Sequence, residues 1–196
     1  VSKFKKSKKK KSLKIGYFGS IFRSRGIDMI IKLSILDKMN DYFIYGGSHE
    51  EIKTIKKNIK NKNIKFTPYL PYSDVSKKLR NIDICILPYT SRVTVSGNVG
   101  DISKYTSPLK IFDYMKLGKL IISSNLNVLK EILVDKKNCL LINNYKSEHE
   151  WQRTISLVGK NFSKFDVIRK NAFDYANKFD LDWRVKKLIS LKKTSK

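Results

Sequence analysis

Short apolar runs alternate with segments of helical pattern along the first two-thirds of the chain, and this alternation constrains the fold most. Six runs have the composition of buried strands, at 14–19, 42–45, 64–66, 82–87, 120–122 and 139–142. Apolar residues at helical spacing predict helices at 26–36, 49–59, 71–80, 108–117, 128–134, 148–158, 165–178 and 183–191. Strands that are buried on both faces have near-continuous apolar sequences, so the pattern predicts a doubly wound, parallel, Rossmann-like α/β sheet.

The basic ends of the chain lie outside this alternation. Residues 1–12 are nearly all Lys and Ser and have no amphipathic pattern, so we expect a disordered basic tail or a linker there. The alternating pattern and the helices after it occupy residues 13–191, a length that suits one domain with its own core. A second short basic tail is expected at 192–196.

The charge of the chain is strongly positive, with 42 Lys and Arg against 17 Asp and Glu and a formal net charge of +25. Such a charge attracts nucleic acid, anionic lipid and phosphorylated small molecules. A general bias toward Lys, Ile and Asn explains it equally well. The basic tract lacks a nucleic-acid motif and interleaved aromatic residues, so a nucleic-acid-binding protein is the less favoured alternative. Lys3–Lys11 is a candidate contact with an anionic membrane, or else a solvated linker.

The cysteines, the apolar stretches and the N-terminus indicate the cell compartment. Cys85 lies in an apolar run and Cys139 begins one, which predicts two buried thiols rather than a disulfide or a metal site. No apolar stretch reaches the roughly 18 residues of a membrane span. The basic N-terminus has no apolar signal-peptide core. We therefore expect a cytoplasmic protein, with peripheral contact at the inner membrane surface as a further hypothesis.

The turn after the first predicted strand, Gly19–Gly26, is the first candidate ligand site. A glycine at each end lets the backbone approach a ligand closely, and the next helix directs its N-terminus at the same place. Arg23 and Arg25 can add charge-assisted hydrogen bonds to a diphosphate. The alternative is that both are ordinary surface arginines of a basic protein.

A second candidate site is the helix that follows the polar segment 89–106, which has no clear period and is predicted as a long loop. Ser107 is a good N-cap for this helix and Pro108 occupies the preferred first position, so free N–H groups face an anion there. Lys110 adds a positive charge, and Asp113 lies on the same face, where it can accept hydrogen bonds from ribose hydroxyls. An ordinary Lys–Asp surface pair is the alternative.

A resemblance to a known family narrows these alternatives. Five segments carry it in order: Lys14-Ile-Gly-Tyr-Phe-Gly, Arg25-Gly-Ile-Asp, Ile82-Asp-Ile-Cys-Ile-Leu-Pro, Ser107-Pro-Leu-Lys-Ile-Phe-Asp-Tyr-Met and Lys137-Asn-Cys-Leu-Leu-Ile. Together they resemble the C-terminal, nucleotide-sugar-binding domain of family-4 glycosyltransferases of the GT-B fold. The resemblance spans residues 13–191 and implies one domain, equivalent to the C-terminal half of such an enzyme.

Roles for individual residues follow from the resemblance. It implies that Arg25 and Lys110 are catalytic, because the matching basic residues meet the donor diphosphate. It also implies a donor-binding set made of the first turn, a base-binding stretch and the start of the second helix: Gly19, Ser20, Tyr69, Leu70, Ser107, Leu109 and Asp113. Arg23 joins this set for its charge in the first turn. Asp113 matches the ribose-binding second glutamate of the family's Glu-x7-Glu motif.

The chain departs from that motif at both positions. Asp113 is one methylene shorter than the family's second glutamate, and Tyr105 stands where the first is expected, near the transferred sugar. These departures keep open a catalytically silent partner subunit as an alternative to an enzyme.

The function that the resemblance implies is transfer of a hexosyl group from a UDP- or GDP-sugar, with retention at the anomeric carbon, to a glycan or lipid-linked acceptor. It implies no cofactor and no metal, and it implies an N-terminal GT-B domain or subunit that these 196 residues do not supply.

Overall fold

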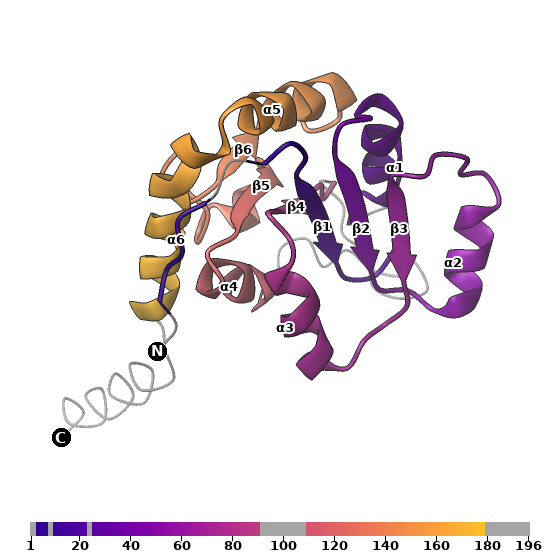
Figure 1. Cartoon of the computed structure of the whole chain (residues 1–196), viewed down its shortest axis with the longest axis horizontal. Helices are drawn as coiled ribbons and strands as arrows, with labels where there is room; N and C mark the ends of the chain where they lie inside the picture. The colour runs from indigo at the N-terminus through magenta and orange to yellow at the C-terminus, as the bar shows by residue number, and fades with distance from the viewer. Residues whose placement is uncertain (1–2, 8–9, 23–24, 91–108, 179–196) are drawn as a thin grey trace.

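A six-stranded parallel sheet forms the centre of the molecule in the computed structural model, which describes residues 3–7, 10–22, 25–90 and 109–178. The strand order is β3-β2-β1-β4-β5-β6, and every neighbouring pair is parallel. The strands are β1 (Lys14–Phe18), β2 (Asp41–Tyr45), β3 (Ile64–Thr67), β4 (Ile84–Leu87), β5 (Leu120–Ser124) and β6 (Leu140–Ile142). All six predicted strands are therefore confirmed, as is the doubly wound fold (Figure 1).

Helices α1 to α4 connect successive strands, α5 and α6 follow the last strand, and the helices cover the sheet (Figure 1). They are α1 (Ile27–Leu36), α2 (His49–Lys56), α3 (Tyr72–Arg80), α4 (Leu109–Lys116), α5 (Glu148–Lys160) and α6 (Asp166–Lys178). The C-terminal helices pack on earlier ones, α5 on α1 and α6 on α4. The chain runs outward from β1 to β3 and then returns to place β4 on the other side of β1. Ligands of such sheets bind where the strand order reverses, at the carboxyl ends of the strands.

The helices predicted at 128–134 and 183–191 are not among the helices that the structure describes. The helix predicted at 128–134 is wrong, because the structure has only a 3-10 turn, η2 (Asn127–Leu129), in that interval. The Asn138 side chain accepts from the Val134 N–H at 2.8 Å and donates to the Ile132 carbonyl at 2.9 Å, so these backbone groups bond locally instead of in a helix. A second 3-10 turn, η3 (Phe162–Phe165), precedes α6. The helix predicted at 183–191 lies outside the described residues.

The core is built mainly from the central strands. Every residue of β4 and β5 is buried, as expected of strands covered on both faces. Both thiols are free and buried, as the sequence predicted, and burial raises the pKa of Cys139 to about 12. Along the described part of the chain, no helix has the length and apolarity needed to cross a membrane.

The segment 3–7, which we call the N-terminal strap, lies along α6 (Figure 1). The Phe4 ring packs against Phe173 at a centroid distance of 5.8 Å, and the Ser7 N–H donates to Asp166 at 2.9 Å. The strap is thus packed on the domain, which differs from the tail predicted to be disordered. The alternative reading of residues 1–12 as a linker, and the domain limits at 13 and 191, stay predictions.

Candidate nucleotide-binding site

Three backbone turns meet at the carboxyl ends of β1, β2 and β4. A side chain at Gly46, which follows β2, would place its Cβ 2.0 Å from the Gly19 carbonyl oxygen, which follows β1. A Cβ at Gly26, the residue before α1, would lie 1.8 Å from the carbonyl oxygen of Pro88, which follows β4. Gly26 also has a φ of 79°, in the left-handed region that favours glycine. The backbones at Gly46 and Gly26 therefore approach the neighbouring turns closely, and the N-terminus of α1 lies where the strand order reverses.

Lys110, on the first turn of α4, contacts the turn after β1. Its Nζ donates to the Phe18 carbonyl at 2.8 Å and lies 5.5 Å from the centres of the Tyr17 and Tyr89 rings. Gly19 makes room for it, because a Cβ there would lie only 2.6 Å from Nζ. A half-buried ammonium group is therefore fixed beside the turn after β1, where the sequence predicted a phosphate site.

Arg25 supplies a second positive charge at the same place. Its guanidinium carbon lies 5.4 Å from the centre of the Tyr89 ring, so Arg25 and Lys110 share that ring. Tyr89 itself is 1% exposed, which holds the ring in one place. The Nε of Arg25 is buried and has no hydrogen-bond partner among the described residues. Two cations and the N-terminus of α1 thus converge on a position suited to an anion.

Tyr17, whose ring lies beneath Lys110, is neutral, which preserves the positive charge of the site. Desolvation by burial, followed by the neighbouring Tyr89, raises the pKa of Tyr17 well above its ordinary value of 10.0. The Tyr17 hydroxyl donates to the Ser20 carbonyl at 2.7 Å and so fixes the turn that begins at Gly19. Burial likewise raises the pKa of Tyr114 well above 10.0. Neither Tyr17 nor Tyr114 therefore forms a tyrosinate near neutral pH that could neutralise Lys110.

Asp113, the predicted ribose-binding residue, lies one turn along α4 from Lys110. Its carboxylate accepts a hydrogen bond at 3.0 Å from the hydroxyl of Tyr72, the first residue of α3. This bond to the carboxylate is the main cause that raises the pKa of Tyr72. Tyr69, three residues earlier, is 57% exposed, and its N–H donates to the Gly47 carbonyl at 3.1 Å. The predicted base-binding stretch and Asp113 therefore lie close together through Tyr72.

The structure places some of the predicted site residues together, and others lie outside the residues that it describes. It brings Gly19, Ser20, Arg25 and Lys110 into one cluster, and Leu70 is half-buried beside Tyr69 on the loop before α3. Leu109 begins α4, but its side chain is not described. Arg23, Tyr105 and Ser107 lie outside the described residues. The donor-binding and catalytic roles of all these residues stay predictions.

Three tyrosines of the site were not selected from the sequence. Tyr17 and Tyr89 support the two cations, and Tyr72 contacts Asp113. Tyr89 carried a usable signal, because it directly follows the proline that ends a buried strand, where ligands of parallel sheets bind. Tyr72 had no such signal, because its contact joins residues 41 positions apart.

No metal centre is formed by the residues that the structure describes, since none of their His, Cys, Asp and Glu side chains group in threes. The chain contains one Asp-x-Asp sequence, Asp180-Leu-Asp182, which lies outside those residues.

The fold and site define a doubly wound, Rossmann-like α/β domain with a cationic site at its topological switch point. A family comparison agrees, matching residues 1–175 to "Glycosyl transferases group 1". The chain belongs to this family, which confirms the resemblance at that level; the family-4 subclass stays a prediction. A search of curated proteins finds no match.

Solved structures with the same fold include two longer proteins and one isolated domain. Anabaena HepE in complex with UDP-glucose is 16% identical, with a TM-score of 0.71 over 94% of this chain and 49% of that one. Sucrose-phosphate synthase from Thermosynechococcus elongatus is 13% identical, with a TM-score of 0.74 over 93% and 45%. The C-terminal domain of a group 1 family protein, LpcC, from Francisella tularensis is 17% identical, with a TM-score of 0.65 over 85% of both chains. The chain thus spans about half of the two longer proteins.

Proposed function

We propose that the chain is the donor-binding domain of a glycosyltransferase that transfers a hexosyl group from a UDP- or GDP-sugar. The observation that carries the proposal is the pair of cations, Arg25 and Lys110, held over one buried tyrosine ring at the end of β1 and β4. Membership of the group 1 family and the UDP-glucose complex of the HepE neighbour support the same conclusion. The proposed place of the domain is the C-terminal half of a GT-B enzyme.

The proposed chemistry is stabilisation of the leaving diphosphate. When the bond between the anomeric carbon and the diphosphate oxygen breaks, negative charge develops on that oxygen. Arg25 and Lys110 meet this charge with fixed donors in a partly desolvated place, and the N-terminus of α1 adds its partial positive charge. We propose that the site works without a metal and that the transferred sugar keeps its anomeric configuration.

The nucleoside would occupy the side of the site beyond Lys110. We propose that Asp113 accepts hydrogen bonds from the ribose hydroxyls in place of the one it accepts from Tyr72. The backbone around Leu70 and Tyr69, a residue that is exposed, would then face the base. Release of Tyr72 frees its hydroxyl and ring to move with the donor, because its side chain is 71% exposed.

The other half of the enzyme is proposed to come from an N-terminal GT-B domain or subunit, which would supply the acceptor site. The acceptor is proposed to be a glycan or a lipid-linked sugar in polysaccharide or glycolipid biosynthesis. A cytoplasmic protein with peripheral contact at an anionic membrane would suit a lipid-linked acceptor. Such contact is favoured by the net charge of +25.

The direct test is titration of the chain with UDP-glucose and GDP-mannose by isothermal titration calorimetry. We expect one of the two nucleotide sugars to bind with a dissociation constant below the millimolar range. Lys110→Gln should weaken it at least about tenfold, because a charged donor to the diphosphate is lost. Lys53→Gln, which removes an equal charge from exposed α2, is the matched control and should bind as the parent does.

Absence of binding by the folded chain with either sugar, even at millimolar concentration, would contradict donor binding. Equal loss in the Lys110 and Lys53 variants would show that only the overall charge matters. A transfer assay with and without a candidate N-terminal-domain partner then separates an enzyme half from a silent subunit.

A further inference from the structure

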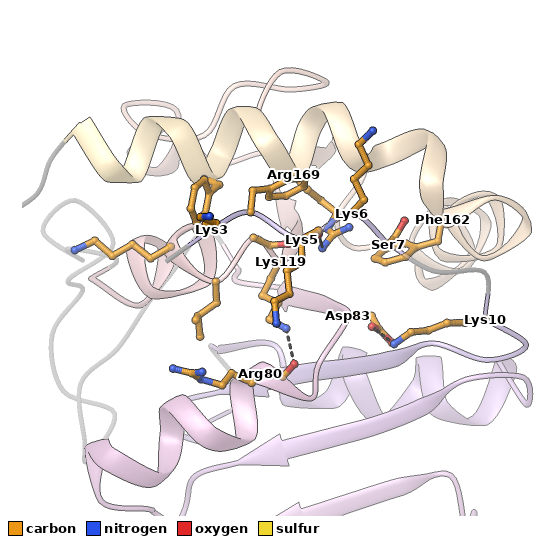
Figure 2. A pocket seen from close by; sticks show the side chains of 15 residues that line it. Lys3, Lys5, Lys6, Ser7, Lys10, Arg80, Asp83, Lys119, Phe162 and Arg169 are labelled. Carbon is orange, nitrogen blue, oxygen red and sulfur yellow. Dashed lines mark hydrogen bonds and ion pairs between the residues drawn. The ribbon is translucent and has the colours of Figure 1, made fainter. Parts of the chain in front are cut away.

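A second basic site lies on the opposite side of the sheet from the strand carboxyl ends, at the amino ends of β4 and β5. A hollow of about 600 Å³ opens there between the N-terminal strap, α6 and the ends of α3 and α4 (Figure 2). Asp83 and Lys119, which precede β4 and β5, form its floor. The proposed donor site lies at the carboxyl ends of the same strands. The four residues of β4 separate the two sites by roughly 13 Å.

The lining of this amino-edge hollow is strongly cationic. Eight of its fifteen residues are Lys or Arg, and Asp83 is the only acidic residue among the fifteen. The polar lining is joined by the apolar rings of Phe4, Phe162 and Phe173. A concave surface with one sign of charge and partly apolar walls concentrates its electrostatic potential, so it favours anions over neutral molecules.

Three of the cations have structural partners. Lys119 donates to the carbonyls of Arg80 at 2.8 Å and Ile82 at 2.6 Å, and so caps the end of α3. Arg169 donates to the Gly118 carbonyl at 2.8 Å after α4. Lys10 pairs with Asp83 at 2.5 Å, which neutralises the acidic residue of the lining (Figure 2). Helix capping and ion pairing therefore explain why these three residues are basic.

Neither capping nor ion pairing explains four further basic side chains of the lining. Those of Lys3, Lys5, Lys6 and Arg80 are exposed and have no acidic or carbonyl partner among the described residues. The Ser7 hydroxyl is buried beside them and also has no hydrogen-bond partner within the described chain. Several donors thus line one hollow without acceptors of their own.

The strap does not need its lysine charges in order to stay in place. Arg169 holds it, with its guanidinium carbon 5.3 Å from the Phe4 ring and 5.1 Å from the Phe162 ring. Arg169 also donates to the Lys5 carbonyl at 3.4 Å, and Phe4 packs on Phe173. These contacts use rings and backbone. The lysine ammonium groups instead add like charge to the lining of the hollow, which a bound anion would offset.

We infer that the amino-edge hollow binds a phosphate group, carried either by a soluble organic phosphate or by the headgroup of an anionic lipid. A phosphate presents several strong acceptor oxygens and up to two negative charges, which match a hollow lined by several cationic donors without acceptors of their own. A volume of about 600 Å³ is that of a small-molecule site and does not admit a nucleic-acid duplex. This inference is independent of the proposed donor site.

The test compares two double variants in an Arg25→Gln, Lys110→Gln background, which removes both cations of the proposed donor site. Lys5→Gln with Arg80→Gln removes two charges from the hollow, and both side chains are exposed. Lys53→Gln with Lys57→Gln removes two exposed charges at the end of α2 and is the matched control. Inorganic pyrophosphate is titrated by calorimetry at low salt, and flotation measures binding to phosphatidylcholine vesicles with and without phosphatidylglycerol.

We expect the hollow variant to lose at least about tenfold in affinity for one of the two probes and the control to stay within about twofold. Loss toward pyrophosphate identifies a soluble phosphate, and loss toward the phosphatidylglycerol vesicles alone identifies a lipid headgroup. Equal losses in both variants, or no binding of either probe by the background chain, would overturn the inference. Thermal unfolding checks the fold, and Lys3→Gln with Lys6→Gln gives an independent second variant of the same hollow.

Discussion

Replacing Tyr89 by leucine removes the ring that both cations of the candidate nucleotide site face. The ring centre lies 5.4 Å from the Arg25 guanidinium carbon and 5.5 Å from the Lys110 Nζ. Without the ring, the Arg25 and Lys110 side chains must be ordered when the donor binds. Ordering costs about 1 kcal/mol of binding free energy for each side chain. The total of about 2 kcal/mol corresponds to roughly thirtyfold weaker binding of a nucleoside diphosphate.

Two further variants isolate the ring from general damage to the fold. Tyr89→Phe keeps the ring and loses only a hydroxyl that has no partner among the described residues, so it should bind as the parent does. Tyr42→Leu removes another fully buried tyrosine, which donates to Asp37 at 2.9 Å at the amino end of β2. It should lower the free energy of unfolding by about 2–4 kcal/mol without changing affinity. Calorimetric titration with UDP and urea denaturation supply both quantities. Equal affinity of Tyr89→Leu and Tyr89→Phe would refute the positioning role.

Two predictions concern stability. Gly46→Ala should lower the free energy of unfolding by about 2–4 kcal/mol, because its Cβ would lie 2.0 Å from a backbone oxygen at a φ of 142°. Gly159→Ala in α5, with nothing within 4 Å of its Cβ, should instead raise it by about 0.5–1 kcal/mol; urea denaturation that ranks the two equally would contradict the geometry. Above pH 10 the unfolded chain loses phenol protons that the folded chain keeps, so stability should fall by up to about 1.4 kcal/mol per pH unit for each buried tyrosine with a raised pKa, namely Tyr17, Tyr42 and Tyr114. Thermal unfolding at pH 8 to 11 measures this slope, and a flat profile would count against it.

Much of the fold was predictable because the physics that sets it is local. Strands of a sheet buried on both faces have near-continuous apolar sequences; β4 is apolar throughout, and β5 is apolar up to Ser123. Ser48 and Glu51 have the spacing of a capping box, and the structure has both of its hydrogen bonds. The helix predicted at 128–134 was wrong because Asn138, which lies beyond its end, forms hydrogen bonds with backbone groups of Ile132 and Val134 that a helix would use. Local pattern does not show such competition.

The candidate site was predictable only in its backbone parts. Gly19 and Gly26 indicated close approach at strand ends, and Lys110 indicated a charge near a helix start, because each of these depends on neighbours in sequence. The ring of Tyr89 under two cations and the Tyr72–Asp113 bond join distant elements, so no periodic pattern shows them. The amino-edge hollow was hidden for the same reason, since the strap was expected to lie free of α6.

The central claim is that Arg25 and Lys110 bind a diphosphate without a metal. The measurement is calorimetric titration of the chain, in the presence of EDTA, with UDP and GDP and with the corresponding nucleosides uridine and guanosine. We predict that one nucleoside diphosphate binds at least about tenfold more tightly than its nucleoside, and that this difference disappears in the Arg25→Gln, Lys110→Gln double variant. Equal affinities of the chain for diphosphate and nucleoside, or a double variant that binds the diphosphate as tightly as the parent, would contradict the account.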